Sequence, residues 1–128
     1  MKKLILVTGG TGYIGSHTTV ELIEAGYDVV IVDNLSNSSI DSLNGIKQIT
    51  GTMPQFENFD LCDKEKLGDF FKKYRGIEAI IHFAALKAVG ESVEKPIEYY
   101  SNNITSLLNL LMAMRNSISQ TLFFRLHD

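Results

Sequence analysis

The sequence feature that most constrains the fold is a short apolar segment that runs directly into a cluster of glycines. Residues 4–7 read Leu-Ile-Leu-Val, and Gly9, Gly10, Gly12 and Gly15 follow. An apolar run of this length is typical of a buried strand, and the residues after the glycines carry apolar side chains at helical spacing. The order strand, tight turn, helix therefore predicts a βα unit whose glycines permit the sharp turn.

The glycine spacing in this turn is typical of a phosphate-binding turn. Gly9, Gly12 and Gly15 are spaced G-x-x-G-x-x-G. Such glycines allow close backbone approach to a pyrophosphate, which would lie at the positive N-terminus of the following helix. A second strand, expected over residues 28–32, ends at Asp33, near the offset of about 20 residues typical of an acid that binds adenosine ribose. The alternative is an ordinary strand-to-helix turn, with Asp33 capping the next segment.

The remaining chain alternates between helix and strand signals. Helices are expected over residues 13–25, 63–74 and 96–114, with a weaker one reaching residue 50. Further strands are expected over residues 55–60 and 79–85, and a fifth one starts near residue 121. This alternation predicts an α/β fold with an incomplete, doubly wound parallel sheet of the Rossmann type, about four to five strands wide. Because the chain stops at Asp128, we expect the outer side of the fourth strand to be paired little or not at all.

Composition excludes several classes of function. The formal net charge is −3, whereas nucleic acid or an anionic membrane surface would require a basic stripe. No apolar run reaches the length of a membrane span. The single Cys62 cannot form an internal disulfide, which fits a reducing compartment, and no His pair has metal-ligand spacing. We therefore expect a cytoplasmic protein without a metal site and without nucleic-acid or membrane partners.

Three segments of the chain match a known enzyme family in both residues and spacing. They are residues 7–17, VTGGTGYIGSH, residues 33–38, DNLSNS, and residues 82–92, HFAALKAVGES. Together they resemble the UDP-glucose 4-epimerase family, a branch of the extended short-chain dehydrogenases/reductases. The glycine motif is common to the whole superfamily, and the loop over residues 86–92 narrows the resemblance to the epimerases. The similarity continues to residue 115 and so covers most of the chain.

The resemblance implies an NAD-dependent isomerase of galactose metabolism. Enzymes of this family move a hydride from C4 of a UDP-hexose to NAD, let the 4-keto sugar rotate, and return the hydride to its other face. UDP-glucose and UDP-galactose are thereby interconverted, and the nicotinamide ends unchanged. The resemblance also implies a homodimer for the full-length parent, whose long helix would contribute an apolar stripe to the interface.

The resemblance further implies which residues contact the cofactor. They are Gly9, Gly12, Tyr13, Ile14, Gly15, Asp33, Asn34, Asn37, Ser38, Asp60, Leu61, Phe83, Ala84, Ala85, Lys87 and Asn102. The uncharged residues after Asp33 favour NAD over NADP, whose 2′-phosphate would require an Arg. Simpler alternatives exist for Ile14 as a core residue, Asp60 as a helix cap and Lys87 as a surface charge. We interpret His17 and His82 as packing residues.

The chain departs from the family at the catalytic pair. The family's base is the Tyr of a Tyr-x-x-x-Lys pair, in which the Lys lowers the pKa of the phenol. None of the five tyrosines of this chain has Lys four residues later, so no catalytic residue is assigned. We expect residues 1–115 to be the N-terminal part of an NAD-binding domain. Residues 116–128 are interpreted as a divergent tail produced by a frameshift, a truncation or a gene-model boundary, and the chain alone as inactive.

Two other functions remain open at this point. One is a sugar-nucleotide 4,6-dehydratase of the same superfamily, although residues 87–92 favour an epimerase. The other is a non-catalytic nucleotide-binding module that works as it stands. An unpaired fourth strand would promote aggregation and so would count against such a module.

Overall fold

The fold is built on one parallel sheet with five strands in the order β3-β2-β1-β4-β5. The computed structural model describes residues 2–35, 39–83, 96–117 and 123–126. The strands are β1 (Leu4–Thr8), β2 (Asp28–Asp33), β3 (Gln55–Asn58), β4 (Ile77–His82) and β5 (Phe123–Leu126). The helices are α1 (Tyr13–Glu24), α2 (Asp41–Thr50), α3 (Lys64–Lys73) and α5 (Pro96–Ser117). The predicted doubly wound α/β fold of the Rossmann type is confirmed.

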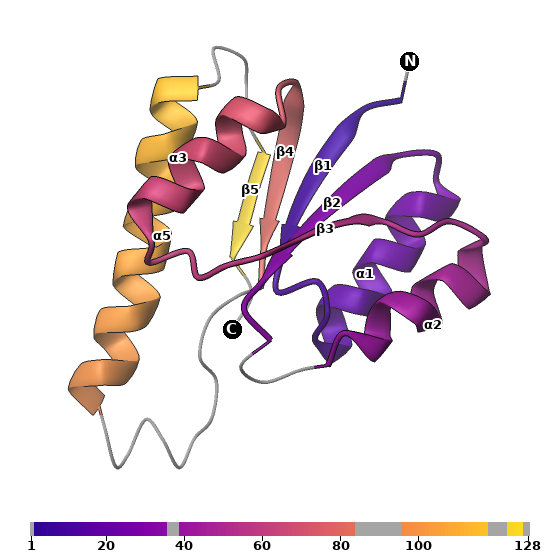
Figure 1. Ribbon diagram of the computed structural model, residues 1–128, viewed down its shortest axis with the longest axis horizontal. Coiled ribbons are helices and arrows are strands. Elements are labelled where there is room, and N and C mark those ends of the chain that lie inside the picture. The colour runs from indigo at the N-terminus through magenta and orange to yellow at the C-terminus, as the bar shows by residue number, and fades with distance from the viewer. Residues whose placement is uncertain (1, 36–38, 84–95, 118–122, 127–128) are drawn as a thin grey trace.

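Helices cover both faces of the sheet, with α1 and α2 on one face and α3 and α5 on the other (Figure 1). The central strand β1 shows why its sequence is a continuous apolar run. Leu6 packs in the cluster under α3 and α5, whereas Ile5 and Val7 pack in the cluster under α1 and α2. Because successive side chains of a strand point to opposite faces, a sheet covered on both sides requires apolar residues at every position.

Local signals set two of the helix ends. The Asp63 carboxylate accepts a hydrogen bond from the backbone N–H of Lys66 at 3.1 Å and so caps α3. Gly51, with φ of 77°, closes α2 in the left-handed conformation. The sequence suggested only a weak helix here, yet α2 is well formed because Leu43 and Ile46 are buried against the sheet. Tertiary packing thus compensates for the weak helical preference of this segment.

Glu57 of β3 fixes the end of α3. Its carboxylate accepts hydrogen bonds from the Tyr74 hydroxyl at 2.7 Å and from the Lys73 ammonium at 2.9 Å. The Tyr74 hydrogen bond is the main cause that lowers the pKa of Glu57 below its ordinary value, and Lys73 adds to it. The strand β3 is shorter than predicted, since it ends at Asn58 instead of residue 60.

The expectation about the outer side of the fourth strand is wrong. The strand β5 pairs with β4 in parallel, from Ala79 opposite Phe123 to His82 opposite Leu126. The pairing arises because α5 carries the chain back to the end of the sheet at which β4 begins. A short segment after α5 is then enough to add a parallel strand beside β4. The strand β4 also begins earlier than predicted, at Ile77, and ends at His82, while residues 84 and 85 lie outside the described part of the chain.

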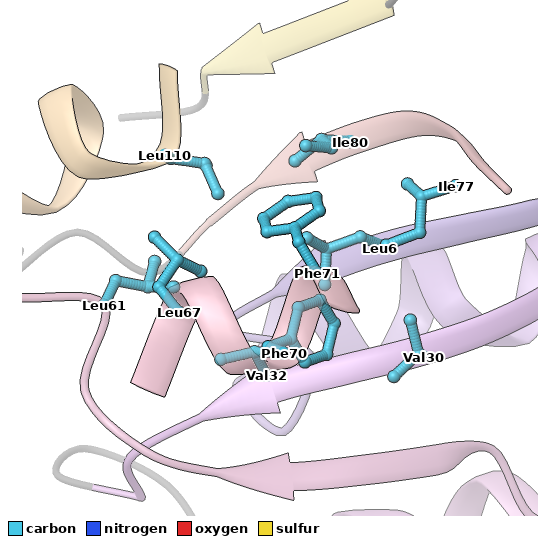
Figure 2. Close-up of a cluster of buried hydrophobic side chains, with 10 residues drawn as sticks. All are labelled: Leu6, Val30, Val32, Leu61, Leu67, Phe70, Phe71, Ile77, Ile80 and Leu110. Carbon is cyan, nitrogen blue, oxygen red and sulfur yellow. The ribbon is translucent and has the colours of Figure 1, made fainter. Parts of the chain in front are cut away.

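The larger core lies between the sheet and the layer of α3 and α5 (Figure 2). Phe70 and Phe71 of α3 point into it and meet edge to face, with ring centroids 5.4 Å apart. From α5, Leu110 enters this core and is 0% exposed, whereas Leu108 on the same helix is 52% exposed. As far as its side chains are described, α5 therefore docks through one side.

This one-sided docking predicts different costs for two equal truncations. We expect Leu110→Ala to lower the free energy of unfolding by about 2–5 kcal/mol, because it removes buried contacts and leaves a cavity. The control Leu108→Ala should change it by no more than about 0.5 kcal/mol, because that side chain is largely in solvent. Urea unfolding followed by circular dichroism measures both, and equal losses would contradict the one-sided docking of α5.

Candidate functional site

The glycine-rich turn lies at the carboxyl edge of the sheet, where β1 ends. The N–H of Gly9 donates to the carbonyl of Val32 at 2.8 Å and ties the turn to β2. The N–H of Gly12 donates to the carbonyl of Gly9 at 3.1 Å and closes the turn. Gly9 has φ of 72°, a left-handed conformation that glycine adopts without steric cost. The first glycine of the motif is therefore required by the backbone itself.

Gly15 is the point at which α1 packs on the turn. A Cβ atom at this residue would lie 2.2 Å from the carbonyl oxygen of Gly9, far inside van der Waals contact. The obstacle is backbone and cannot move aside as a flexible side chain would. The close packing of α1 on the turn therefore requires glycine at residue 15.

The amino terminus of α1 is suited to an anion. Its N-cap is Gly12, which offers no side-chain cap, and its first turn contains no acidic residue. The first N–H groups of an α-helix have no intrahelical acceptor, and the helix dipole adds positive potential there. Tyr13 and Ile14, in this first turn, are 81% and 43% exposed. The alternative that Ile14 is a core residue is therefore wrong, because its side chain lies at the surface beside the turn.

Asp33 ends β2 beside the glycine turn and is only 8% exposed. Its Oδ2 accepts hydrogen bonds from the Thr11 N–H, at 3.2 Å, and from the Thr11 hydroxyl, while its Oδ1 accepts from the Leu35 N–H at 2.8 Å. The carboxylate is thus held against the turn from two sides. Two carboxylate oxygens can accept about four hydrogen bonds in all, so acceptor capacity remains for a ligand hydroxyl at this edge. Asn34, which follows, is exposed.

A buried polar pair joins β1 to β4 at the same edge. The Thr8 hydroxyl and Nδ1 of His82 are 2.6 Å apart, and the two residues are 0% and 1% exposed. The N–H of Phe83 donates to the Thr8 carbonyl at 2.9 Å and to the Thr8 hydroxyl oxygen at 3.1 Å. Burial lowers the pKa of His82 to about 4, so the ring is neutral near pH 7. His82 is a packing residue, as interpreted, and with Thr8 it fixes the place of Phe83.

The segment after β3 leaves the sheet at this same edge. Leu61 is 4% exposed and packs in the core, while its carbonyl accepts a hydrogen bond from Nδ2 of Asn109 at 3.0 Å. A ligand contact of Leu61 would therefore use main-chain atoms. The exposed Asp60 accepts from the N–H of Cys62 at 2.9 Å, and burial is the main cause that raises the pKa of the Cys62 thiol to about 11. The alternative of Asp60 as the helix cap is wrong, because Asp63 caps α3.

The carboxyl edge of the sheet brings together the described members of the predicted site. They are Gly9, Gly12, Tyr13, Ile14, Gly15, Asp33, Asn34, Asp60, Leu61 and Phe83. Asn102 lies in α5, and its side chain is outside the description. Asn37, Ser38, Ala84, Ala85 and Lys87 lie outside the described residues. The cofactor contacts of all of these residues stay a prediction.

Two residues of the edge were missed by the sequence reasoning. Thr11 binds Asp33, and the Ser42 hydroxyl of α2 donates to the Thr11 carbonyl at 2.7 Å. The sequence signal that could have identified Thr11 is a hydroxyl residue between two glycines of the turn, a position that the glycine motif does not specify. His17 also differs from its interpretation as a packing residue, since it is exposed and its ring lies 4.7 Å from the ring of Tyr13.

Two negative findings hold for the part of the chain that the structure describes. Its His, Cys, Asp and Glu residues form no group that could hold a metal ion. None of its helices combines the length and the apolar character needed to cross a membrane.

Comparison with known proteins relates this arrangement to nucleotide-sugar enzymes. The family model described as GDP-mannose 4,6 dehydratase matches residues 6–126. UDP-glucose 4-epimerase of Bacillus subtilis is 56% identical over 110 residues, which are 86% of this chain and 32% of the relative. The chain thus spans about a third of the length of such curated relatives.

Two solved structures have the same fold over nearly the whole chain. UDP-glucose 4-epimerase from Bifidobacterium longum in complex with NAD+ and UDP superposes with a TM-score of 0.89 at 46% identity, covering 95% of this chain and 36% of that chain. The enzyme from Stenotrophomonas maltophila, with bound NAD and formylated UDP-arabinopyranose, gives a TM-score of 0.88 at 45% identity and covers 95% and 36%.

The tight contact at Gly15 predicts a large and selective cost of a single methyl group. We expect Gly15→Ala to lower the free energy of unfolding by at least about 2 kcal/mol, because the new Cβ collides with backbone. The control Gly68→Ala, in α3, meets nothing within 4 Å and should raise stability by up to about 1 kcal/mol. Thermal unfolding of both variants provides the measurement, and a neutral Gly15→Ala would refute the packing role of this glycine.

The buried His82 predicts a pH dependence of stability. Because the folded pKa of about 4 lies below the ordinary 6.5, the unfolded chain binds more protons between these values. Stability from this group is complete above about pH 6.5 and falls by up to about 3 kcal/mol as the pH drops to 4. His82→Asn should flatten this decline in urea unfolding, whereas His17→Asn, at an exposed residue, should leave it as in the wild type. An unchanged slope in His82→Asn would contradict the assignment.

Proposed function

Since this chain belongs to the GDP-mannose 4,6 dehydratase family, we propose that it forms the NAD-binding part of a UDP-glucose 4-epimerase. The observation that carries the proposal is the placement of the Asp33 carboxylate against the glycine turn that opens α1. The Asp33 carboxylate suits the ribose hydroxyls of a nucleotide, and the glycine turn that opens α1 suits its pyrophosphate. The solved relatives that carry NAD at the same fold support this choice of cofactor.

The residues present fit the two polar parts of NAD. N–H groups of the first turn of α1 would bind the pyrophosphate, and the absence of acidic residues from that turn avoids repulsion. Asp33 would accept hydrogen bonds from the adenosine ribose, and the uncharged Asn34 offers no partner for a 2′-phosphate. Bound NAD supplies the hydride acceptor. The described part of the chain contributes binding and orientation.

For the whole enzyme we propose the interconversion of UDP-glucose and UDP-galactose through a 4-keto intermediate. Relatives that bear the epimerase name at more than half identity support this activity over that of a 4,6-dehydratase. The description of the matching family model keeps the dehydratase as the second candidate. We propose that this chain alone has no turnover, because none of its tyrosines belongs to a Tyr-x-x-x-Lys pair.

We also propose a homodimer for the whole enzyme, formed through α5. Exposed apolar side chains recur along this helix and support an interface. They are Ile97, Ile104, Leu108, Leu111 and Met112, with exposed fractions between 39% and 80%. The single cysteine of the sequence supports our further proposal of a cytoplasmic location.

NAD should stabilise this chain. At about 100 times its dissociation constant, a ligand that binds only the folded state adds roughly 2.7 kcal/mol to the free energy of unfolding, so the unfolding temperature should rise. Asp33→Asn should reduce the rise, because a neutral amide accepts ribose hydrogen bonds less strongly than a carboxylate. Differential scanning fluorimetry with NAD, NADP and no ligand measures these shifts.

Two outcomes would overturn parts of the proposal. A cooperative transition that NAD leaves unmoved would contradict NAD binding by this chain. Epimerisation of UDP-galactose by the purified chain, followed by a coupled assay, would contradict the absence of turnover. Stable NAD binding by a monomer without activity would agree with the proposal for the chain and also with the alternative of a non-catalytic module. An epimerase assay on the longer protein would distinguish these two interpretations.

A further inference from the structure

We propose that Thr11 and Ser42 form a positioning chain that fixes the Asp33 carboxylate for ribose binding. The inference rests on the proposed function, because it concerns how the acid of the NAD site is held. Thr11 is 1% exposed, so its side chain is covered and acts through Asp33 instead of touching a ligand. Neither residue belongs to the glycine spacing or to the acid that the dinucleotide motif specifies.

The first link is the contact between Thr11 and Asp33. Thr11 donates to Oδ2 of Asp33 with both its N–H and its hydroxyl, while Leu35 donates to Oδ1 from the other side. An aspartate side chain has two rotatable bonds, and donors on both oxygens restrict both of them. Hydrogen bonds to a charged acceptor are also stronger than neutral ones. Thr11 thus holds the carboxylate plane in one orientation before a ligand arrives.

The second link is the contact between Thr11 and α2. The Ser42 hydroxyl donates to the Thr11 carbonyl at 2.7 Å across 31 residues of sequence. Ser42 lies in the first turn of α2, and the next residue, Leu43, is buried in the core under α1 and α2. The glycine turn has little side-chain mass of its own with which to pack. Helix α2 therefore supports the turn through the Ser42 hydroxyl.

The third observation is the conformation of Leu35. It has φ of 62°, a left-handed conformation that a non-glycine residue adopts only at a steric cost. The conformation brings its N–H to Oδ1 of Asp33, so the same carboxylate stabilises a strained turn at the edge of the site. An interaction maintained against local strain is the kind expected where geometry matters for binding. Thr11 and Leu35 thus restrain the Asp33 carboxylate through its two oxygens.

The test is NAD binding by the full chain, measured by isothermal titration calorimetry. Thr11→Val removes the hydroxyl and should weaken NAD binding about tenfold. Thr11→Ser retains the hydroxyl and should stay within about twofold of the wild type. Ser42→Ala should weaken NAD binding about threefold, since Ser42 acts on Asp33 only through Thr11. This variant also provides the test if Thr11→Val does not fold. The control Thr50→Val removes a similar hydroxyl bond, to the Ile46 carbonyl at the far end of α2, and should leave binding unchanged.

Two readouts separate positioning from general destabilisation. In an Asp33→Asn background, Thr11→Val should cost less than about twofold, because its effect passes through the carboxylate. The NAD analogue that lacks the adenosine 2′-hydroxyl should bind wild type and Thr11→Val with nearly equal affinity. A loss that is equal in both backgrounds, or equal for NAD and the analogue, would overturn the inference. Wild-type affinity for NAD in Thr11→Val would overturn this inference and leave the proposed function intact. Absence of NAD binding by the wild type would overturn the proposed function and, with it, this inference.

Discussion

The contact on which the rest of this structure depends is the one between Gly15 and the carbonyl oxygen of Gly9. The two residues belong to the helix and to the turn before it, and their approach leaves no space for a single additional carbon. Because α1 can lie this close, its N-terminus opens directly at the end of β1. The same closeness brings Thr11 to Asp33 and so assembles the polar edge of the sheet. A minimal van der Waals contact thus sets the geometry of the whole site.

Polar groups inside the carboxyl edge each fix a segment of backbone. Thr8 and His82 hold Phe83, Asp33 holds Leu35, and Asn109 holds the segment after β3 through its carbonyl. Among the described residues no buried side-chain nitrogen or oxygen is without a hydrogen-bond partner. Burial of such groups is costly unless they are paired, so their pairing defines where the connecting segments run. The edge is organised by hydrogen bonds, whereas the sheet behind it is organised by apolar packing.

The sequence predicted the local features of this fold and missed those that depend on distant residues. The glycine turn and Asp33 are specified by a few neighbouring residues, so their patterns were sufficient. The pairing of β5 with β4 depends on where α5 returns the chain, which no local pattern reports. Ile14 was ambiguous because an apolar residue in a first helical turn is buried only if something packs on it. Thr11 was missed for the same reason, since its role exists only through Asp33 and Ser42.

The strand order has a consequence for how the chain reaches its native state. All neighbouring strands are parallel, so no pair of them can form as a hairpin, and every pairing must wait for a crossover. The central strand β1 is made first on the ribosome, yet its partners are β2 and the much later β4. One edge of the most apolar strand therefore stays open through much of synthesis. Such a high proportion of non-local pairing slows folding, and it leaves apolar strands exposed to aggregation until their partners arrive.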